Sequence, residues 1–189
     1  MADVADAFAV PAIVGPDGRP LGETSPAIVH ADADMRALVD SLGRQPYDLM
    51  TLDPREFEKI VAHLLDRDGY EVKLQPKSGR GHPDHGIDIL AVRKQGVGQF
   101  VMGIQCKRKN TDNKVSGAMV RELMGSLLWS NLDRGVLVTT SEFQPQAFEY
   151  EQGAPHKAGV ALDLVDYHRL VRWLKVYGRS DEDDGAGPH

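Results

Sequence analysis

The amino-acid sequence predicts an α/β protein with a central mixed β-sheet flanked by helices. Between residues 51 and 174, helical and strand patterns of apolar residues follow in the order helix, three strands, helix, strand, helix, strand, helix. Two of the strands, 87–92 and 100–107, are separated by a short glycine-containing turn, which is typical of an antiparallel hairpin. The continuous apolar run at 135–140 is typical of a buried strand parallel to its neighbour. A sheet with strands in both directions accommodates these patterns.

Length and composition restrict the class of protein. The chain has 189 residues, enough for one medium-sized domain, and its 41% hydrophobic and 26% charged residues exclude collagen-like, disulfide-scaffold and wholly disordered classes. No apolar run approaches the roughly 20 residues that span a bilayer, and the acidic start lacks the basic region of a secretory signal. The one cysteine, Cys106, permits neither an internal disulfide nor a cysteine-based zinc site. We therefore expect a cytoplasmic protein with no membrane partner.

The first helix of the α/β pattern is expected to begin at Asp53, a favourable N-cap, followed by Pro54, which suits the first helical position. Its apolar residues share one stripe that ends before Gly69: Phe57, Ile60, Val61, Leu64 and Leu65. Strands are expected over 70–74, 87–92 and 100–107, with a loop rich in glycine, proline and charge over 77–85. The second half predicts a helix over 115–131, a strand over 135–140, a helix over 145–152, a strand over 160–165 and a last helix capped by Asp166.

The two ends of the chain differ from this pattern. Residues 1–50 are short and proline-rich, so we interpret them as an N-terminal extension, with a turn at 15–20 that joins two extended pieces into a short hairpin and a helix over 32–42. We assign 51–177 to a single domain. Residues 178–189 contain an acidic run at 181–184 and predict a disordered acidic tail.

Charge is distributed unevenly along the chain. The net charge of −6 argues against a surface that binds nucleic acid everywhere. Residues 73–114, however, hold nine basic and three acidic side chains, a net charge of +6, which leaves −12 for the rest. Such a segment suits an anionic ligand, although charge alone favours an ordinary solvated face.

Three polar residues interrupt strands that otherwise predict burial. Asp88 lies within an apolar strand, where an unpaired carboxylate is costly. Gln105 and Lys107 are two residues apart and therefore project from one face of the neighbouring strand. Because hairpin strands pair directly, the three side chains can converge; two oxygen donors suit Mg²⁺, and a lysine suits a phosphate or an activated water. The alternative is a plain hairpin with a salt bridge between Asp88 and Lys107, and this pattern alone leaves both interpretations open.

A glutamate on the first helix adds context. Successive residues of a helix are rotated by about 100°, which places Glu58 just beyond Leu65 at the edge of the apolar stripe, whereas Glu56 lies at the opposite edge. Glu58 can thus reach the edge of the sheet, although either glutamate alone is typical of a solvated helix residue.

In their order and spacing, these motifs resemble the Mrr-type restriction endonuclease domain, in the glutamine-containing branch of the PD-(D/E)xK nuclease superfamily. The resemblance covers residues 51–175 and rests on LDPREFEKIV at 52–61, GYEV at 69–72, DHGIDILA at 84–91 and IQCKR at 104–108, with later strands at 135–141 and 161–166. It implies a restriction-endonuclease-like core and Mg²⁺-dependent hydrolysis of DNA, with Mn²⁺ as a substitute metal. The neutral glutamine departs from the acidic residue of other branches and is expected to weaken metal binding.

The resemblance also implies roles for individual residues. Asp88 would be the main Mg²⁺ carboxylate, Gln105 the second ligand, and the carbonyl of Cys106 the third. Lys107 would orient or activate the water, and Glu58 would support the metal directly or through water. Asp84 matches an acidic position of less definite role, and we group it with the candidate DNA-binding residues of the basic segment, for each of which simple solvation is the alternative: Lys77, Arg80, Arg108 and Lys109.

We therefore expect a metal-dependent endonuclease acting in restriction and antiviral defence against foreign or modified DNA. One alternative is a repair or junction-resolving nuclease with the same site; another is a catalytically silent nuclease fold that binds DNA or assembles with a partner. Self-association is a further expectation, because cutting both strands requires two sites, and target recognition would come from this domain, an oligomer or a partner.

Overall fold

A computed structural model describes residues 33–76, 86–95, 98–110, 112–132, 134–152 and 159–177. Within them lies a five-stranded mixed sheet whose spatial order, β1-β2-β3-β4-β5, is the sequence order. The strands are β1 (Glu71–Leu74), β2 (Ile89–Gln95), β3 (Gly98–Lys107), β4 (Arg134–Thr139) and β5 (Ala161–Val165). Strands β1, β2 and β3 pair antiparallel, whereas β3, β4 and β5 pair parallel. The predicted α/β class with a mixed sheet is confirmed.

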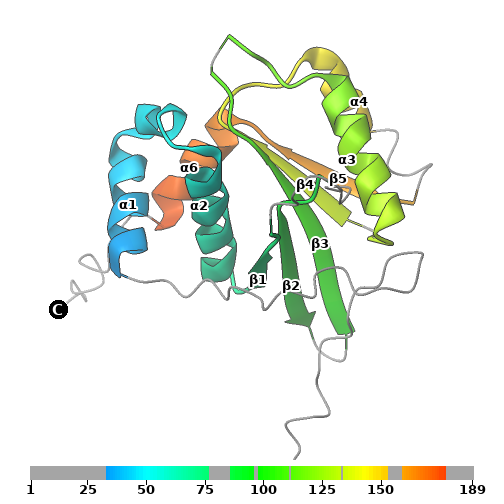
Figure 1. Ribbon diagram of the computed structural model, residues 1–189, viewed down its shortest axis with the longest axis horizontal. Helices are drawn as coiled ribbons and strands as arrows, with labels where there is room; N and C mark the ends of the chain where they lie inside the picture. The colour runs from blue at the N-terminus through cyan, green and yellow to red at the C-terminus, as the bar shows by residue number, and fades with distance from the viewer. Residues whose placement is uncertain are drawn as a thin grey trace, which may run out of the picture.

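Helices cover both faces of this sheet (Figure 1). One group consists of α1 (Ala33–Arg44), the 3₁₀-helix η2 (Pro46–Met50), α2 (Pro54–Arg67) and α6 (Tyr167–Tyr177), and the other of α3 (Gly117–Trp129) and α4 (Pro145–Gln152). Each group packs on its own apolar cluster, the first against Ile104 and Met102 of β3 and the second against Leu137 of β4. No helix in the described residues is long and apolar enough to cross a membrane.

Helix α2 begins as expected. The side chain of Asp53 accepts hydrogen bonds from the backbone N–H groups of Arg55 and Glu56, and the Glu56 carboxylate accepts one from the N–H of Asp53 at 2.9 Å. This capping box satisfies N–H groups that have no partner inside the helix. The helix ends before Gly69, whose φ of +83° lies in the left-handed region that glycine adopts without strain.

Several predicted boundaries differ from those of the structure by one to three residues. Strand β2 begins at Ile89, so Asp88 precedes the strand instead of lying inside it. Helix α3 begins at Gly117, not at residue 115, because Val115 forms an isolated parallel bridge with Phe143. The backbone of Asp88 still bonds to both neighbouring segments, because its N–H donates to the carbonyl of Ile104 and its carbonyl accepts from the N–H of Gln75.

Helix α1 lies where a helix was expected over 32–42. Its Val39 and Leu42 are buried, and it packs against α6. Residues 33–50 therefore contribute to the same apolar cluster as α2. The expected N-terminal hairpin and the acidic tail lie outside the described residues.

Two glycines allow α3 to pack closely against the sheet. Gly103 of β3 and Gly135 of β4 are register partners, and Leu127 of α3 packs over both. A Cβ atom on Gly135 would overlap Cδ1 of Leu127, and one on Gly103 would lie 3.0 Å from its Cδ2. The absence of both side chains therefore lets this fully buried leucine reach the backbone of the sheet.

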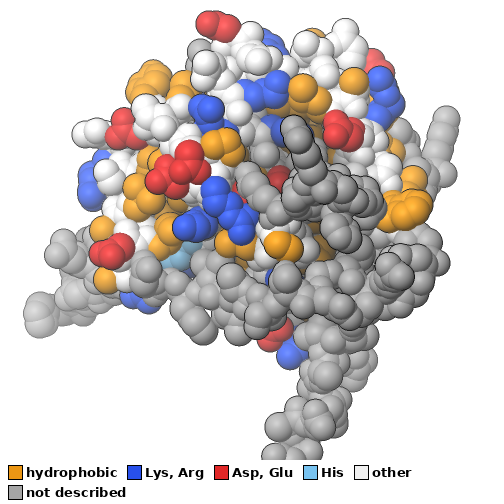
Figure 2. Space-filling view, in the orientation of Figure 1, with side chains coloured by type: hydrophobic (Ala, Val, Ile, Leu, Met, Phe, Trp, Pro, Cys, Tyr) orange, Lys and Arg blue, Asp and Glu red, His pale blue; other side chains and the backbone are white. Residues whose placement is uncertain are grey.

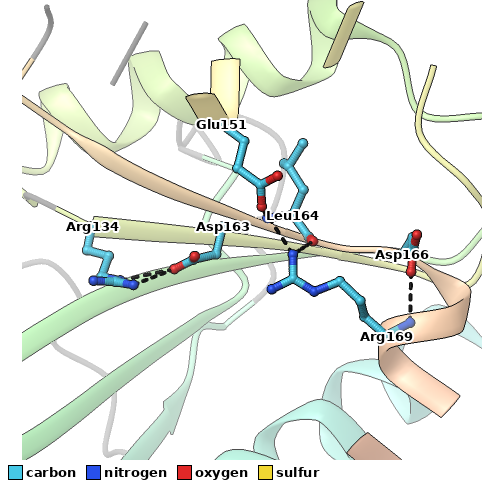
Figure 3. A network of polar contacts seen from close by, with 6 residues as sticks. All are labelled: Arg134, Glu151, Asp163, Leu164, Asp166 and Arg169. Carbon is cyan, nitrogen blue, oxygen red and sulfur yellow. Dashed lines mark hydrogen bonds and ion pairs between the residues drawn. The ribbon is translucent and has the colours of Figure 1, made fainter. Parts of the chain in front are cut away.

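The outer edge of β5 is covered by a polar network (Figure 3). The Glu151 carboxylate accepts a hydrogen bond from the N–H of Leu164 at 3.0 Å, and Arg169 donates to the carbonyl of the same residue. Arg169 also pairs with Glu151 at 3.1 Å. The two side chains thus satisfy both backbone groups of Leu164.

Candidate active site

The β2–β3 hairpin brings the polar residues of the predicted site to one end of the sheet. The last register pair at that end is Ile89 with Ile104, so Asp88 and Gln105 come next on the two strands. The backbone N–H of Asp88 donates to the carbonyl of Ile104 at 2.8 Å, and its Oδ2 accepts from the N–H of Cys106 at 2.7 Å. These two bonds lie on either side of Gln105 in the chain and hold Asp88 against β3.

Gln105 is a buried polar residue with an orphaned acceptor. Its side chain is 1% exposed, and Oε1 has no hydrogen-bond partner in the described part of the chain. A buried acceptor without a partner costs roughly 1–3 kcal/mol. A bound cation would relieve that cost, which makes this oxygen a suitable metal ligand.

Cys106 presents its backbone to the same edge of β3. In a strand, the N–H and C=O of one residue point to the same edge, because a hydrogen-bonded pair exchanges both bonds. Since the N–H of Cys106 points to Asp88, its carbonyl faces that edge as well. Its half-buried side chain packs on the opposite face with the cluster under α2.

Lys107 ends β3 beside these residues. Its carbonyl accepts a hydrogen bond from Oγ1 of Thr139 at 2.7 Å, which ties the strand end to β4. The side chain is half-buried and forms no ion pair with any residue that the structure describes. The alternative of a salt bridge between Asp88 and Lys107 is therefore not observed.

Glu58 is buried in α2, with 3% of its surface exposed. Its Oε2 lies 2.6 Å from Nη1 of Arg55, and the same nitrogen donates to the carbonyl of Gln75 at 3.1 Å. The N–H of Gln75 in turn donates to the carbonyl of Asp88 at 2.8 Å. A short chain of polar contacts thus connects the predicted helix glutamate to Asp88, whereas Glu56 is used in the helix cap. Arg55 was not singled out in the sequence, because an arginine three residues before a glutamate is common on solvated helices.

The predicted DNA-binding residues are only partly described. Lys77, Arg80 and Asp84 lie outside the described residues. Arg108 is half-buried and donates from Nη1 to the carbonyl of Met50 at 3.1 Å, and Lys109 Nζ lies 3.3 Å from Oδ1 of Asn113. On the face shown in Figure 2, the described basic side chains are scattered among acidic and hydrophobic ones and form no continuous patch.

The donor set fits a hard divalent cation. No group of three or more His, Cys, Asp or Glu side chains that could hold a metal occurs within the described residues. The predicted set does not need one, because it combines one carboxylate, one amide oxygen and one backbone carbonyl. All three are oxygen donors of the kind that Mg²⁺ binds, and Mg²⁺ usually keeps several waters besides. The orphaned Oε1 of Gln105 is the observation that supports this fit.

A separate open groove of about 550 Å³ lies over the other end of the sheet. It includes none of the predicted site residues, and its rim groups are paired with one another: Arg134 with Asp163 at 2.8 Å and Trp173 with Asp68 at 3.0 Å. Figure 3 shows the first of these pairs. The groove therefore does not belong to the candidate active site.

The mixed five-stranded sheet, with a carboxylate, an amide and a lysine at one end of its hairpin, defines the class of restriction-endonuclease-like domains. The restriction endonuclease family model of the Mrr catalytic domain matches residues 49–174. The chain therefore belongs to this family, and the resemblance noted from the motifs is confirmed.

The chain is also similar to two curated proteins. The chain is 31% identical over 164 residues to the type IV methyl-directed restriction enzyme EcoKMrr of Escherichia coli, covering 84% of this chain and 50% of that protein. It is 30% identical over 134 residues to an uncharacterized protein, y4cE, of Sinorhizobium fredii, covering 66% of this chain and 32% of that one. The chain thus spans half of the first relative's length and a third of the second's.

The structural comparisons show the fold. The DNA modification-dependent restriction endonuclease AspBHI superimposes with a TM-score of 0.55 at 21% identity, covering 85% of this chain and 40% of that chain. The MspJI restriction endonuclease, solved in complex with a 27-mer oligonucleotide, gives a TM-score of 0.51 at 20% identity, covering 82% of this chain and 34% of that chain. In both cases the matched region is less than half of the longer chain.

Proposed function

We propose that this domain is a Mg²⁺-dependent DNA endonuclease that acts in restriction of foreign or modified DNA. The observation that carries the proposal is the placement of Asp88, Gln105 and Lys107 at one end of the β2–β3 hairpin, with a buried amide oxygen that has no partner among the described residues. A hairpin that served only the fold would gain stability from an apolar residue at position 105.

Each residue has a defined role in this proposal. The Asp88 carboxylate, the Gln105 amide oxygen and the Cys106 carbonyl would hold the metal, and Mn²⁺ would replace Mg²⁺ in the same oxygen set. When bound, the metal would stabilise the charge that develops on the scissile phosphate and activate a water. Lys107, the only cation among these residues, would orient the attacking water and offset the negative charge of the phosphate. Glu58, held by Arg55, would support the site from α2.

The preference for modified DNA is the finer part of the proposal. It rests on the names of the relatives, one methyl-directed and one modification-dependent. The chain spans half of the length of the E. coli relative and less than half of each solved structure, and recognition of the target DNA would come from this domain, a second copy or a partner. Two copies would also supply the two sites that a double-strand cut requires.

The test is cleavage of methylated and unmethylated plasmid in Mg²⁺, Mn²⁺ or EDTA, beside the Asp88→Ala variant. We expect metal-dependent nicking or linearisation that the variant lacks, with a difference between the two plasmids. Preference for branched or damaged duplexes in a substrate panel would favour the repair or junction-resolving alternative. DNA binding with no cutting in any metal, and no difference between wild type and Lys107→Ala, would favour the silent module.

A further inference from the structure

Gly86 lies two residues before Asp88, and its backbone has a conformation that residues with a side chain rarely adopt. Its φ is +66°, in the left-handed region that L-residues rarely adopt. A Cβ atom built on Gly86 would lie 2.7 Å from Nε2 of Gln105, closer than real Cβ contacts come. The Gln105 amide therefore occupies the space that a side chain at residue 86 would need.

A second side chain lies close to the same position. The same Cβ position lies 3.5 Å from Oγ of Ser126 in α3, whose hydroxyl donates to the carbonyl of Glu122 at 3.0 Å. Gln105 itself is 1% exposed, so its side chain is enclosed by the surrounding protein.

We propose that Gly86 is a positioning residue for the metal site, because its missing side chain lets the Gln105 amide seat against the backbone and fixes Oε1 as a metal ligand. This inference rests on the proposed function. The oxygen that would bind the metal belongs to the same rigid amide group that touches Gly86, so a displacement of a few tenths of an ångström at one end moves the other. Changes to groups that orient metal ligands typically weaken metal binding about 10–100-fold.

Gly69 provides a matched control. Its φ of +83° is also left-handed, but among the described atoms a Cβ atom there meets only Nη2 of Arg93, at 3.8 Å, an ordinary contact. Gly69→Ala therefore shares the backbone strain of Gly86→Ala without the overlap with a functional side chain. A difference in metal affinity between the two variants would therefore be due to the contact with Gln105.

The experiment compares both variants in the full chain by titration calorimetry with Mg²⁺ and Mn²⁺, without DNA, and by urea unfolding in EDTA. We expect both to lower the urea midpoint and only Gly86→Ala to weaken metal binding, by about 10–100-fold. In a Gln105→Ala background, Gly86→Ala should lower the urea midpoint only as much as Gly69→Ala does, because the overlapping amide is gone.

Equal metal affinity for Gly86→Ala and Gly69→Ala would overturn the proposal, as would an undiminished loss of midpoint in the Gln105→Ala background. Should Gly86→Ala not fold, Gln105→Asn draws the same amide back by one methylene, and unchanged affinity in that variant would also contradict the inference. A wild-type chain that binds neither metal would refute the metal site itself, whereas wild-type binding with equal variants would refute only the role of Gly86.

Discussion

The carboxylate of Asp88 accepts a hydrogen bond from the backbone N–H of Cys106 at 2.7 Å, across the gap between the start of β2 and the end of β3. The same side chain that is proposed to bind Mg²⁺ therefore also holds the hairpin together at the site. Charge and hydrogen bonding at this position can be separated by substitution.

Asp88→Asn retains a carbonyl oxygen for the Cys106 N–H but removes the negative charge. We expect its unfolding free energy to stay near that of the wild type and its Mg²⁺-dependent plasmid cleavage to fall at least about 100-fold. Asp88→Ala should lose cleavage and, in addition, about 1 kcal/mol of stability, because the N–H loses its acceptor. Plasmid assays and urea unfolding measure both; an Asn variant that cuts like the wild type would refute the metal-binding role.

Lys107→Met removes the charge of the lysine and keeps its length. We expect cleavage to fall about 10²–10³-fold, while DNA affinity in EDTA and the thermal midpoint change little, because Lys107 has no ion pair within the described part of the chain. Lys175→Met, at an exposed position of α6, is the matched control and should cleave normally. Equal cleavage rates for the two variants would exclude a catalytic role for Lys107.

The pair of Arg55 and Glu58 predicts a stability effect. Arg55→Met removes a counter-charge of Glu58, whose side chain is almost completely buried, but the Arg55 side chain is 35% exposed, so we expect a loss of about 1–3 kcal/mol in unfolding free energy instead of the larger cost of a fully buried pair. The double variant with Glu58→Gln should recover most of the unfolding free energy lost in Arg55→Met. In urea unfolding, Arg134→Met is the control from a more exposed pair, expected to cost less than about 1 kcal/mol; a loss as large as that of Arg55→Met would contradict the argument.

The recess formed by two facing glycines predicts a packing effect. Gly135→Ala would force a Cβ atom into fully buried Leu127, so we expect a loss of about 1–3 kcal/mol in unfolding free energy. Leu127→Ala should partly relieve this loss in the double variant, although it opens a cavity of its own. Gly125→Ala, with no described atom within 4 Å of its new Cβ, should be neutral or stabilising by up to about 1 kcal/mol.

Asp68 predicts a pH dependence of stability. Burial raises the pKa of its carboxyl above the usual value near 3.8, against the opposing effects of the hydrogen bond from Trp173 and the charge of Arg93. The folded chain therefore keeps this proton to higher pH than the unfolded chain, so the contribution of Asp68 is fully present below pH 3.8 and declines as pH rises through the raised pKa. Asp68→Asn does not titrate, so urea unfolding across this window should show its stability rising relative to the wild type. A difference that is constant with pH would contradict the assignment.

Much of the fold could be predicted from local patterns. The capping residues at Asp53 and Pro54 and the apolar stripe gave the start and buried face of α2, and the alternation in 100–107 gave the two faces of β3. These features depend on residues close in sequence, which is why they could be predicted. The start of β2 could not, because the apolar run begins at Ile87 whereas the strand begins at Ile89.

The residues of the candidate site could be predicted from the sequence, but the contacts that hold them in place could not. The sequence singled out Asp88, Gln105, Lys107 and Glu58 from polar groups in apolar surroundings and from the family resemblance. Gly86 was not singled out, because its contact with Gln105 depends on a loop conformation with positive φ and on a side chain 19 residues away. Local patterns cannot encode such a contact.

The network of Glu151 and Arg169 on β5 has a consequence for assembly. An edge strand with free N–H and C=O groups is a template for adding a strand from another chain. At Leu164 both groups are already bonded, and a charged carboxylate and guanidinium stand where an incoming strand would lie. Another chain could therefore not continue the sheet across β5 at Leu164 unless this pair first broke.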